Sequence, residues 1–323
     1  MSNRTVESHA MSNTNIICCV DSSDERSDIV FEAAAHIVSV CQSAHLTVFS
    51  AHRAPSSGVS SPFALPTERE PRTIALHYEA KCVGRWSKVR FEVITAELPE
   101  ATPIREGLMD VITALNGDIV VLGFTGRKGP KEDPKIMGSS TDLSLRNGGV
   151  SALIVKCGGP YKTIAVAFDG SVRSMAALTV AAHAALDAVK IIAIFVKTDA
   201  VSSDVQTDEE RTDKATELVH PILAKIAAIK DGTVPTFKYV AVRCLDMESI
   251  SQTFIRAADE EDASLLVASP RDHLLMSSRV AAADFVSNKL GSFCDALVRG
   301  SKIDTLIVHP QSNPDAHGVS FRT

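Results

Sequence analysis

Aromatic side chains are scarce in this sequence, whose 323 residues include one tryptophan and three tyrosines. Proteins that bind single-stranded nucleic acid stack bases on such rings, so their scarcity argues against that class. An excess of positive charge does not replace them, because the formal net charge is −6 and the pI is near 5.9. The sequence therefore predicts no binding to nucleic acid and no attraction to anionic membranes.

Long apolar runs and paired cysteines are missing as well. No run approaches the ~18 apolar residues of a membrane-spanning helix, and the polar start of the chain lacks the apolar centre of a signal peptide. The seven cysteines form no C-x-x-C pair and no metal-type cluster with histidine. Most are therefore interpreted as reduced core residues. These absences predict a cytoplasmic protein with no membrane segment.

The most informative stretch runs from Ile119 to Lys156. Its first four residues are apolar and mostly β-branched, which predicts a strand buried on both faces. Gly123 and Gly126 follow, and after eleven further residues Gly138-Ser139-Ser140-Thr141 opens a short predicted helix. Glycine lets backbone N–H groups approach phosphate oxygens, and a helix start favours negative charge. The stretch predicts an anion site, although glycine-rich turns of this kind also occur where nothing binds.

The chain repeats itself. A predicted strand ends in Asp21-Ser22-Ser23, and another ends in Asp169-Gly170-Ser171, 148 positions later. Residues 138–156 also align without gaps on residues 291–309. The second alignment pairs Gly138 with Gly291, Ser139 with Ser292, Asp142 with Asp295, and Arg146 with Arg299. Because the two alignments bracket both halves, they indicate a duplication.

Strands and helices alternate in each half. The first half has predicted strands at 15–20, 46–50, 89–95, 119–122 and 152–155, and helices at 29–41, 73–86, 102–115 and after Thr141. The second has strands at 164–168, 190–196, 236–242, 264–268 and 306–308, and helices at 174–186, 211–229, 247–259 and after Gly291. This alternation predicts α/β domains with doubly wound parallel sheets and ligands at the carboxyl ends of the strands. The predicted domains are 15–157 and 161–310, with a disordered tail at 1–14, a joint at 157–160 and a tail at 311–323.

The pattern resembles the universal stress protein family in its tandem two-domain form. The family's first strand ends in an Asp-Gly-Ser-like turn, which both halves carry. Its nucleotide-binding branch has G-x2-G-x9-G-[ST], which Gly123, Gly126 and Gly138-Ser139 resemble with a spacer two residues longer. The Gly-Arg-x-Gly often found there is matched by residues 126–129. The resemblance implies two Rossmann-like (adenine-nucleotide α-hydrolase-like) domains packed as a pseudo-dimer.

The resemblance also implies an ATP site, with Mg²⁺, in the first domain. Asp21 would bind the ribose or position the metal, or it would only be the N-cap of the first helix. Ser139 and Ser140 would donate to phosphate, cap their own helix, or do both. The charged loop after Gly126 would flank the phosphates or form a solvated surface. The residues implied in binding are Asp21, Ser22, Ser50, Ala51, Gly123, Gly126, Arg127, Gly129, Gly138, Ser139 and Ser140, with the backbone at 50–51, after the second strand, beside the adenine.

The second half departs from this pattern. Ala268 and Arg271 stand where the first half has Gly123 and Gly126, and Pro270 lacks the backbone N–H that a phosphate site would use. About twenty residues then precede Gly291. The second domain is therefore predicted not to bind ATP in the family's way.

Two functions remain open. One is a nucleotide-binding regulatory or stress-response protein, and the other is a structural or interaction protein that uses the same duplicated fold without nucleotide. No G-x4-G-K-[ST], no G-x-S-x-G and no kinase motif occurs, so we expect no enzyme, or at most slow ATP hydrolysis. The resemblance implies pairing of Ala152–Val155 with Thr305–Val308 inside the chain, and it leaves a homodimer open.

Overall fold

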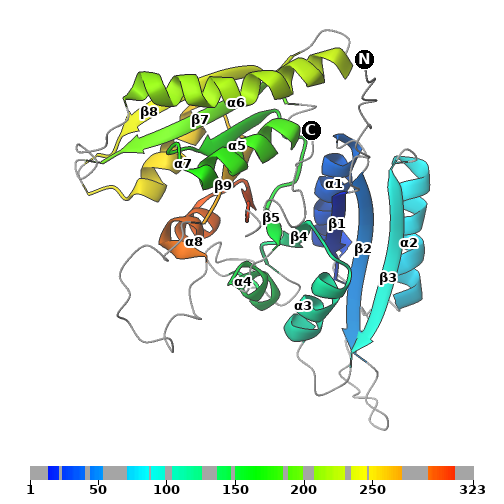
Figure 1. Ribbon diagram of the computed structural model, residues 1–323. Coiled ribbons are helices and arrows are strands. Elements are labelled where there is room, and N and C mark those ends of the chain that lie inside the picture. The colour runs from blue at the N-terminus through cyan, green and yellow to red at the C-terminus, as the bar shows by residue number, and fades with distance from the viewer. Residues whose placement is uncertain are drawn as a thin grey trace, which may run out of the picture.

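A computed structural model shows one continuous sheet with helices on both faces (Figure 1). It describes residues 14–21, 24–40, 44–53, 71–86, 89–98, 104–125, 137–146, 150–184, 188–198, 207–229, 234–245, 247–270 and 290–309. In the first half the strands are β1 (Thr14–Cys19), β2 (Ala44–Arg53), β3 (Arg90–Leu98), β4 (Ile119–Gly123) and β5 (Ser151–Val155). The helices between them are α1 (Asp24–Val40), α2 (Pro71–Gly84), α3 (Ile104–Ala114) and α4 (Ser139–Arg146).

The second half has the same order. Its strands are β6 (Thr163–Ala167), β7 (Lys190–Lys197), β8 (Thr236–Arg243), β9 (Leu265–Ala268) and β10 (Asp304–Ile307). Its helices are α5 (Val172–His183), α6 (Asp208–Ile229), α7 (Ile250–Glu260) and α8 (Gly291–Gly300). The strand order is β3-β2-β1-β4-β5-β10-β9-β6-β7-β8. The predicted mixed α/β architecture is therefore confirmed.

Two apolar clusters cover the two faces of the sheet. One joins buried side chains of α1, α2, α5 and α6 to the strands, and the other joins those of α3, α4, α7 and α8. The inner strands are mostly apolar, and every residue of β5 and β10 is buried, as expected for strands with helices on both faces. In the described part of the chain, no helix is long and apolar enough to cross a membrane.

Some boundaries differ from the prediction. β2 continues to Arg53, which pairs with Leu98 on β3, so Ser50 and Ala51 lie inside the strand and not after it. Thr14, expected in the tail, is the first residue of β1. α6 begins at Asp208, with three acidic residues in its first turn, where they interact favourably with the helix dipole. The other predicted tail residues, 1–13 and 311–323, lie outside the described residues, as does residue 310.

The two halves join through β5 and β10, which pair antiparallel, whereas the other neighbouring strands pair parallel. Thr305 pairs with Ile154, Leu306 with Leu153, and Ile307 with Ala152. The pairing predicted between the last strands of the halves is confirmed. An antiparallel pair at this place relates the halves by an approximate two-fold axis, so equivalent residues near the axis face each other.

The two-fold relation brings together four charged residues of α4 and α8, which we call the seam quartet: Asp142, Arg146, Asp295 and Arg299. Within each helix the arginine pairs with the aspartate four positions earlier, at 2.8 Å in α4 and 3.1 Å in α8. Across the seam, Arg299 Nη2 lies 3.0 Å from Asp142 Oδ1, and Arg146 Nη2 lies 3.6 Å from Asp295 Oδ1. The hydrogen bond from Arg146 is the main cause of a lowered pKa at Asp142.

Asp142→Asn is expected to lower the free energy of unfolding by about 1 kcal/mol at neutral pH. Because the folded state lowers the pKa of Asp142 from 3.8, this contribution is present above pH 3.8 and lost as the pH falls through the folded-state value. Urea unfolding at several pH values should show the difference from wild type closing in acid. The exposed Asp259 of α7 provides the control, since Asp259→Asn should change stability little at any pH. A difference that stays constant into acid would contradict the account.

The joint between the halves is held by a carboxylate, that of Asp304 on β10, which is 0% exposed. It accepts hydrogen bonds from the backbone N–H groups of Lys156, Cys157 and Gly158 at 2.7, 2.9 and 3.1 Å. The hydroxyl of Tyr161 donates a further bond of 2.7 Å. Gly158 has a φ of 78°, a left-handed backbone that favours glycine. Asp304, a buried residue of the second half, thus holds the backbone segment that leads out of the first half.

Candidate functional site

Asp21 lies at the carboxyl end of β1 and is tied to α1. Its Oδ1 accepts a hydrogen bond of 2.8 Å from Ser27 Oγ, and its N–H donates to the same hydroxyl oxygen at 3.0 Å. Ser27, in the first turn of α1, is 3% exposed. α1 begins at Asp24, three residues after Asp21, so the choice between a ligand role and a capping role for Asp21 stays a prediction. Its carboxylate is oriented by a buried serine at the edge where ligands of such sheets bind.

The turn after β4 meets the start of α4. Gly138 N–H donates to Phe124 O at 2.8 Å, and Thr141 Oγ1 donates to Gly123 O at 2.8 Å. Gly123 and the Gly138-Ser139 pair, predicted to act together, are thus brought together. A Cβ on Gly123 would lie 3.3 Å from Val30 Cγ2 on α1, so packing against this helix also favours glycine there.

Gly138 itself does not offer an N–H group to a ligand, because that group is used within the turn. The first intrahelical bond runs from Asp142 N–H to Gly138 O at 2.9 Å. The N–H groups of Ser139, Ser140 and Thr141 precede it, so helix geometry directs them out of the N-terminus. These three groups and the helix dipole are the features of this edge that favour an anion.

Arg26 adds a positive charge that the sequence analysis missed. It belongs to the first turn of α1, and its Nη1 donates to Thr125 Oγ1 at 2.9 Å. This contact places a guanidinium group between the β1 end and the β4 turn. The sequence shows only an arginine in the first turn of the helix that follows Asp21. An arginine at such a position is too common to identify a site without the structure.

Ser50 and Ala51 lie near the same edge although they are inside β2. β1 pairs with β2 only as far as Cys19 and Phe49, whereas β2 and β3 remain paired to Arg53. The side of β2 that faces β1 therefore continues past the end of the β1 pairing. At this place the backbone of β2 is able to contact a planar ring such as adenine.

The predicted site residues thus divide into two groups. Those in the described part of the chain lie at the carboxyl edge of the first sheet half: Asp21, Ser50, Ala51, Gly123, Gly138, Ser139 and Ser140. The others lie outside the described residues: Ser22, Gly126, Arg127 and Gly129. The charged loop that contains Gly126, Arg127 and Gly129 also lies outside the described residues, so its role stays a prediction.

Comparison with known proteins decides the family. The model of the universal stress protein family matches residues 12–156 and again residues 160–309. The chain belongs to the universal stress protein family. It carries two copies of the family's domain in tandem, as the repeat and the resemblance had indicated. No curated protein matches the sequence significantly.

Two solved structures share the fold over nearly the whole chain. One, a universal stress protein from Archaeoglobus fulgidus, is 14% identical, covers 92% of this chain and 97% of that one, and has a TM-score of 0.59. A putative member from Pseudomonas aeruginosa is 15% identical, covers 93% and 95% of the two chains, and has a TM-score of 0.58. Another universal stress protein, solved in complex with cAMP, is 22% identical over 47% of this chain, with a TM-score of 0.33.

The corresponding edge of the second universal-stress-protein repeat is crossed by basic side chains. Lys214 Nζ donates to Gly170 O at 2.8 Å, and Arg173 Nη1 donates to Pro270 O at 2.8 Å. Asp169 Oδ1 accepts from the Ser171 N–H at 3.0 Å, so this carboxylate is engaged by its own turn. The turn after β6 and the turn after β9 are therefore each tied to a neighbouring helix by a cation.

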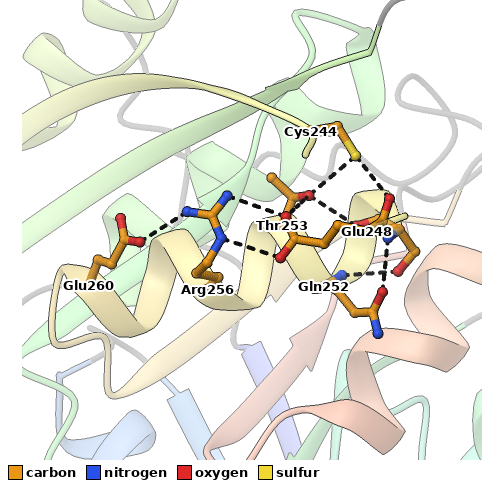
Figure 2. Close-up of polar contacts among 7 residues, drawn as sticks. Cys244, Glu248, Gln252, Thr253, Arg256 and Glu260 are labelled. Carbon is orange, nitrogen blue, oxygen red and sulfur yellow. Dashed lines mark hydrogen bonds and ion pairs between the residues drawn. The ribbon is translucent and has the colours of Figure 1, made fainter. Parts of the chain in front are cut away.

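A polar cluster begins at the same edge and extends along α7 to its last residue (Figure 2). It consists of Cys244, Glu248, Ser249, Gln252, Thr253, Arg256 and Glu260. Ser249 and Gln252 form a reciprocal capping box, and Thr253 Oγ1 donates to Glu248 at 2.8 Å. Arg256 binds the same carboxylate at 3.2 Å, which lowers the pKa of Glu248. These groups bind one another, which indicates a helix-start scaffold.

Proposed function

We propose that this protein binds ATP, together with Mg²⁺, in its first domain (residues 15–157) and acts as a nucleotide-dependent regulatory protein. The observation that carries the proposal is the meeting, at one edge of the sheet, of Asp21, the Gly123 turn and the start of α4. The second domain (residues 161–310) is proposed not to bind ATP in the same way.

The chemistry of the donors suits a triphosphate. The outward N–H groups at the start of α4 are the kind of donors that bind phosphate at helix N-termini. Arg26, on the other side of the β4 turn, supplies a fixed positive charge near the same place. A guanidinium group and backbone N–H groups together fit an anion with several oxygens.

A carboxylate suits the other part of the ligand. Asp21 is held by the buried Ser27 at the end of β1, where it is able to accept hydrogen bonds from ribose hydroxyls or to bind Mg²⁺. Mg²⁺, when bound, would offset the charge of the phosphates. The β1-facing side of β2 at Ser50 and Ala51 is the proposed place of the adenine.

The role is proposed to be regulatory because the known nucleotide-hydrolysing motifs are missing from the sequence. In the second domain, Lys214 of α6 binds the backbone of the turn after β6, where a nucleotide would enter. Ala268 and Pro270 replace the residues that would approach a phosphate. These differences support a single nucleotide site per chain.

Thermal unfolding with and without millimolar Mg-ATP tests this function. A ligand that binds only the native state at a hundredfold excess over its Kd adds about 2.7 kcal/mol of stability, so the unfolding temperature should rise. Gly126→Glu, which places a carboxylate in the glycine-rich turn, should remove the rise. Absence of a rise in the wild type would refute the proposal and leave an interaction protein on the same fold.

A further inference from the structure

The two parts of the candidate site that would bind phosphate are both linked to the second domain, one directly and the other through Lys156. One part is α4, whose first turn supplies the outward N–H groups. The other is the β4 turn, represented by Gly123 and Phe124. Each part is joined to α8 by a separate set of charged contacts, and these contacts are not explained by nucleotide binding within the first domain.

The first connection is the seam quartet. Asp142 lies one turn after Ser139 on α4, and its Oδ1 lies 3.0 Å from Arg299 Nη2 on α8. The four side chains are each about one-third exposed, so solvent screens them less than a pair on the open surface. A network of this kind restrains a helix more firmly than an isolated surface ion pair does.

The second connection is Lys156, which directly follows β5. Its Nζ donates to the carbonyl oxygens of Val298 and Ser301, at 2.5 Å each, at the C-terminal end of α8. Carbonyls at a helix end lack intrahelical partners and favour a cation. The same ammonium lies 4.4 Å from the centre of the Phe124 ring, a distance at which cation–π attraction is effective.

Phe124 connects this lysine to the phosphate end of the site. Its N–H donates to Val155 O at 2.9 Å, and its own carbonyl oxygen accepts from Gly138 N–H at 2.8 Å. The contacts therefore run from α8 through Lys156 and Phe124 to the residue that precedes α4. Burial lowers the pKa of Lys156 to about 8, against the opposing effect of the Asp304 charge.

The connection is not symmetric. In the repeat alignment, His309 is the counterpart of Lys156 and Ser269 is the counterpart of Phe124. The His309 N–H donates to Ser151 Oγ at 3.2 Å, and Ser269 Oγ donates to Val308 O at 2.7 Å. His309 has no ammonium group, and Ser269 has no aromatic ring, so the lysine–phenylalanine contact has no counterpart in the second half. The lysine–aromatic contact thus serves the turn of the first domain.

We propose that the second domain positions the nucleotide site of the first, with Arg299 and Lys156 as positioning residues that hold α4 and the β4 turn. This inference rests on the proposed function. It assigns a role to the domain that is proposed not to bind ATP: α8 provides the support against which α4 is held. Nucleotide binding and domain pairing are then coupled, and the coupling acts in both directions.

Arg299→Met tests the inference, because it removes the guanidinium group and its charge and replaces the aliphatic part of the side chain by an unbranched apolar chain. Its Kd for Mg-ATP should rise by about fivefold or more, the lower end of typical couplings. Arg299→Lys should recover part of the affinity. Arg256→Met is the matched control: Arg256 also pairs with two carboxylates in the second domain, but α7 lies outside these contacts, so the Kd should stay near the wild-type value.

Hydrogen exchange supplies a readout that a purely structural role would not change. In the wild type, Mg-ATP should slow exchange in α8, which belongs to the other domain, and Arg299→Met should reduce that effect. Should Arg299→Met fail to fold, Lys156→Met removes the second connection and carries the same expectation. The inference would be overturned if Arg299→Met and Lys156→Met bound Mg-ATP with wild-type affinity and if ATP did not change hydrogen exchange in α8. The proposed ATP site would still stand in that case. A wild type that binds no ATP would instead overturn the proposed function.

Discussion

Asp304→Ala is expected to lower the free energy of unfolding by at least about 3 kcal/mol. The carboxylate is fully buried and accepts from three successive backbone N–H groups and from Tyr161. Alanine would leave these donors without their partner in a place with little access for water. The loss should appear as a lower urea midpoint with an unchanged slope.

Ser151→Ala provides the matched control, because Ser151 is the counterpart of Asp304 in the repeat. Ser151 is also buried, but its hydroxyl oxygen accepts from one backbone N–H, that of His309. Its removal should cost about 1 kcal/mol. Equal losses in the two variants would show that Asp304 does not hold the joint, because the two sites differ mainly in how many donors each acceptor satisfies.

Ser139→Asp is expected to abolish ATP binding without destabilising the fold. Ser139 is the exposed first residue of α4, where a carboxylate interacts favourably with the helix dipole and adds up to about 1 kcal/mol of stability. The same charge would repel a phosphate at the outward N–H groups. Without nucleotide, the variant should therefore unfold at the wild-type temperature or slightly above it, and Mg-ATP should raise the unfolding temperature of the wild type alone.

Ser292→Asp gives the corresponding control in the second domain. Ser292 is the counterpart of Ser139 and lies, exposed, in the first turn of α8. Its replacement introduces the same charge at an equivalent helix start. Mg-ATP should still raise the unfolding temperature of this variant. If both substitutions removed it, repulsion at the first-domain site would not be the cause.

Much of the fold could be predicted from the sequence because its strands are apolar and its helices periodic. The pairing of β5 with β10 followed from the duplication and the family resemblance. The extension of β2 to Arg53 could not be foreseen, since His52 and Arg53 are polar and their place in the strand depends on pairing with β3. Hydrophobic pattern identifies buried strands better than the ends of strands near an edge.

The candidate site was predicted less completely. Glycines and the Asp21 turn stand out because their spacing follows a motif. Arg26 and Lys156 do not, because each acts through a partner that is distant in sequence: Thr125 for Arg26, and the end of α8 for Lys156. The seam quartet could be predicted only in part. Its residues were recognised as repeat landmarks, but only the two-fold pairing shows that they meet.

The most direct test of the central claim is a calorimetric titration of the whole protein with Mg-ATP. We expect one binding site per chain in the wild type, with the signal lost in Ser139→Asp and retained in Ser292→Asp. Two sites per chain would contradict the assignment of nucleotide binding to the first domain alone. No binding at all would contradict the ATP site itself.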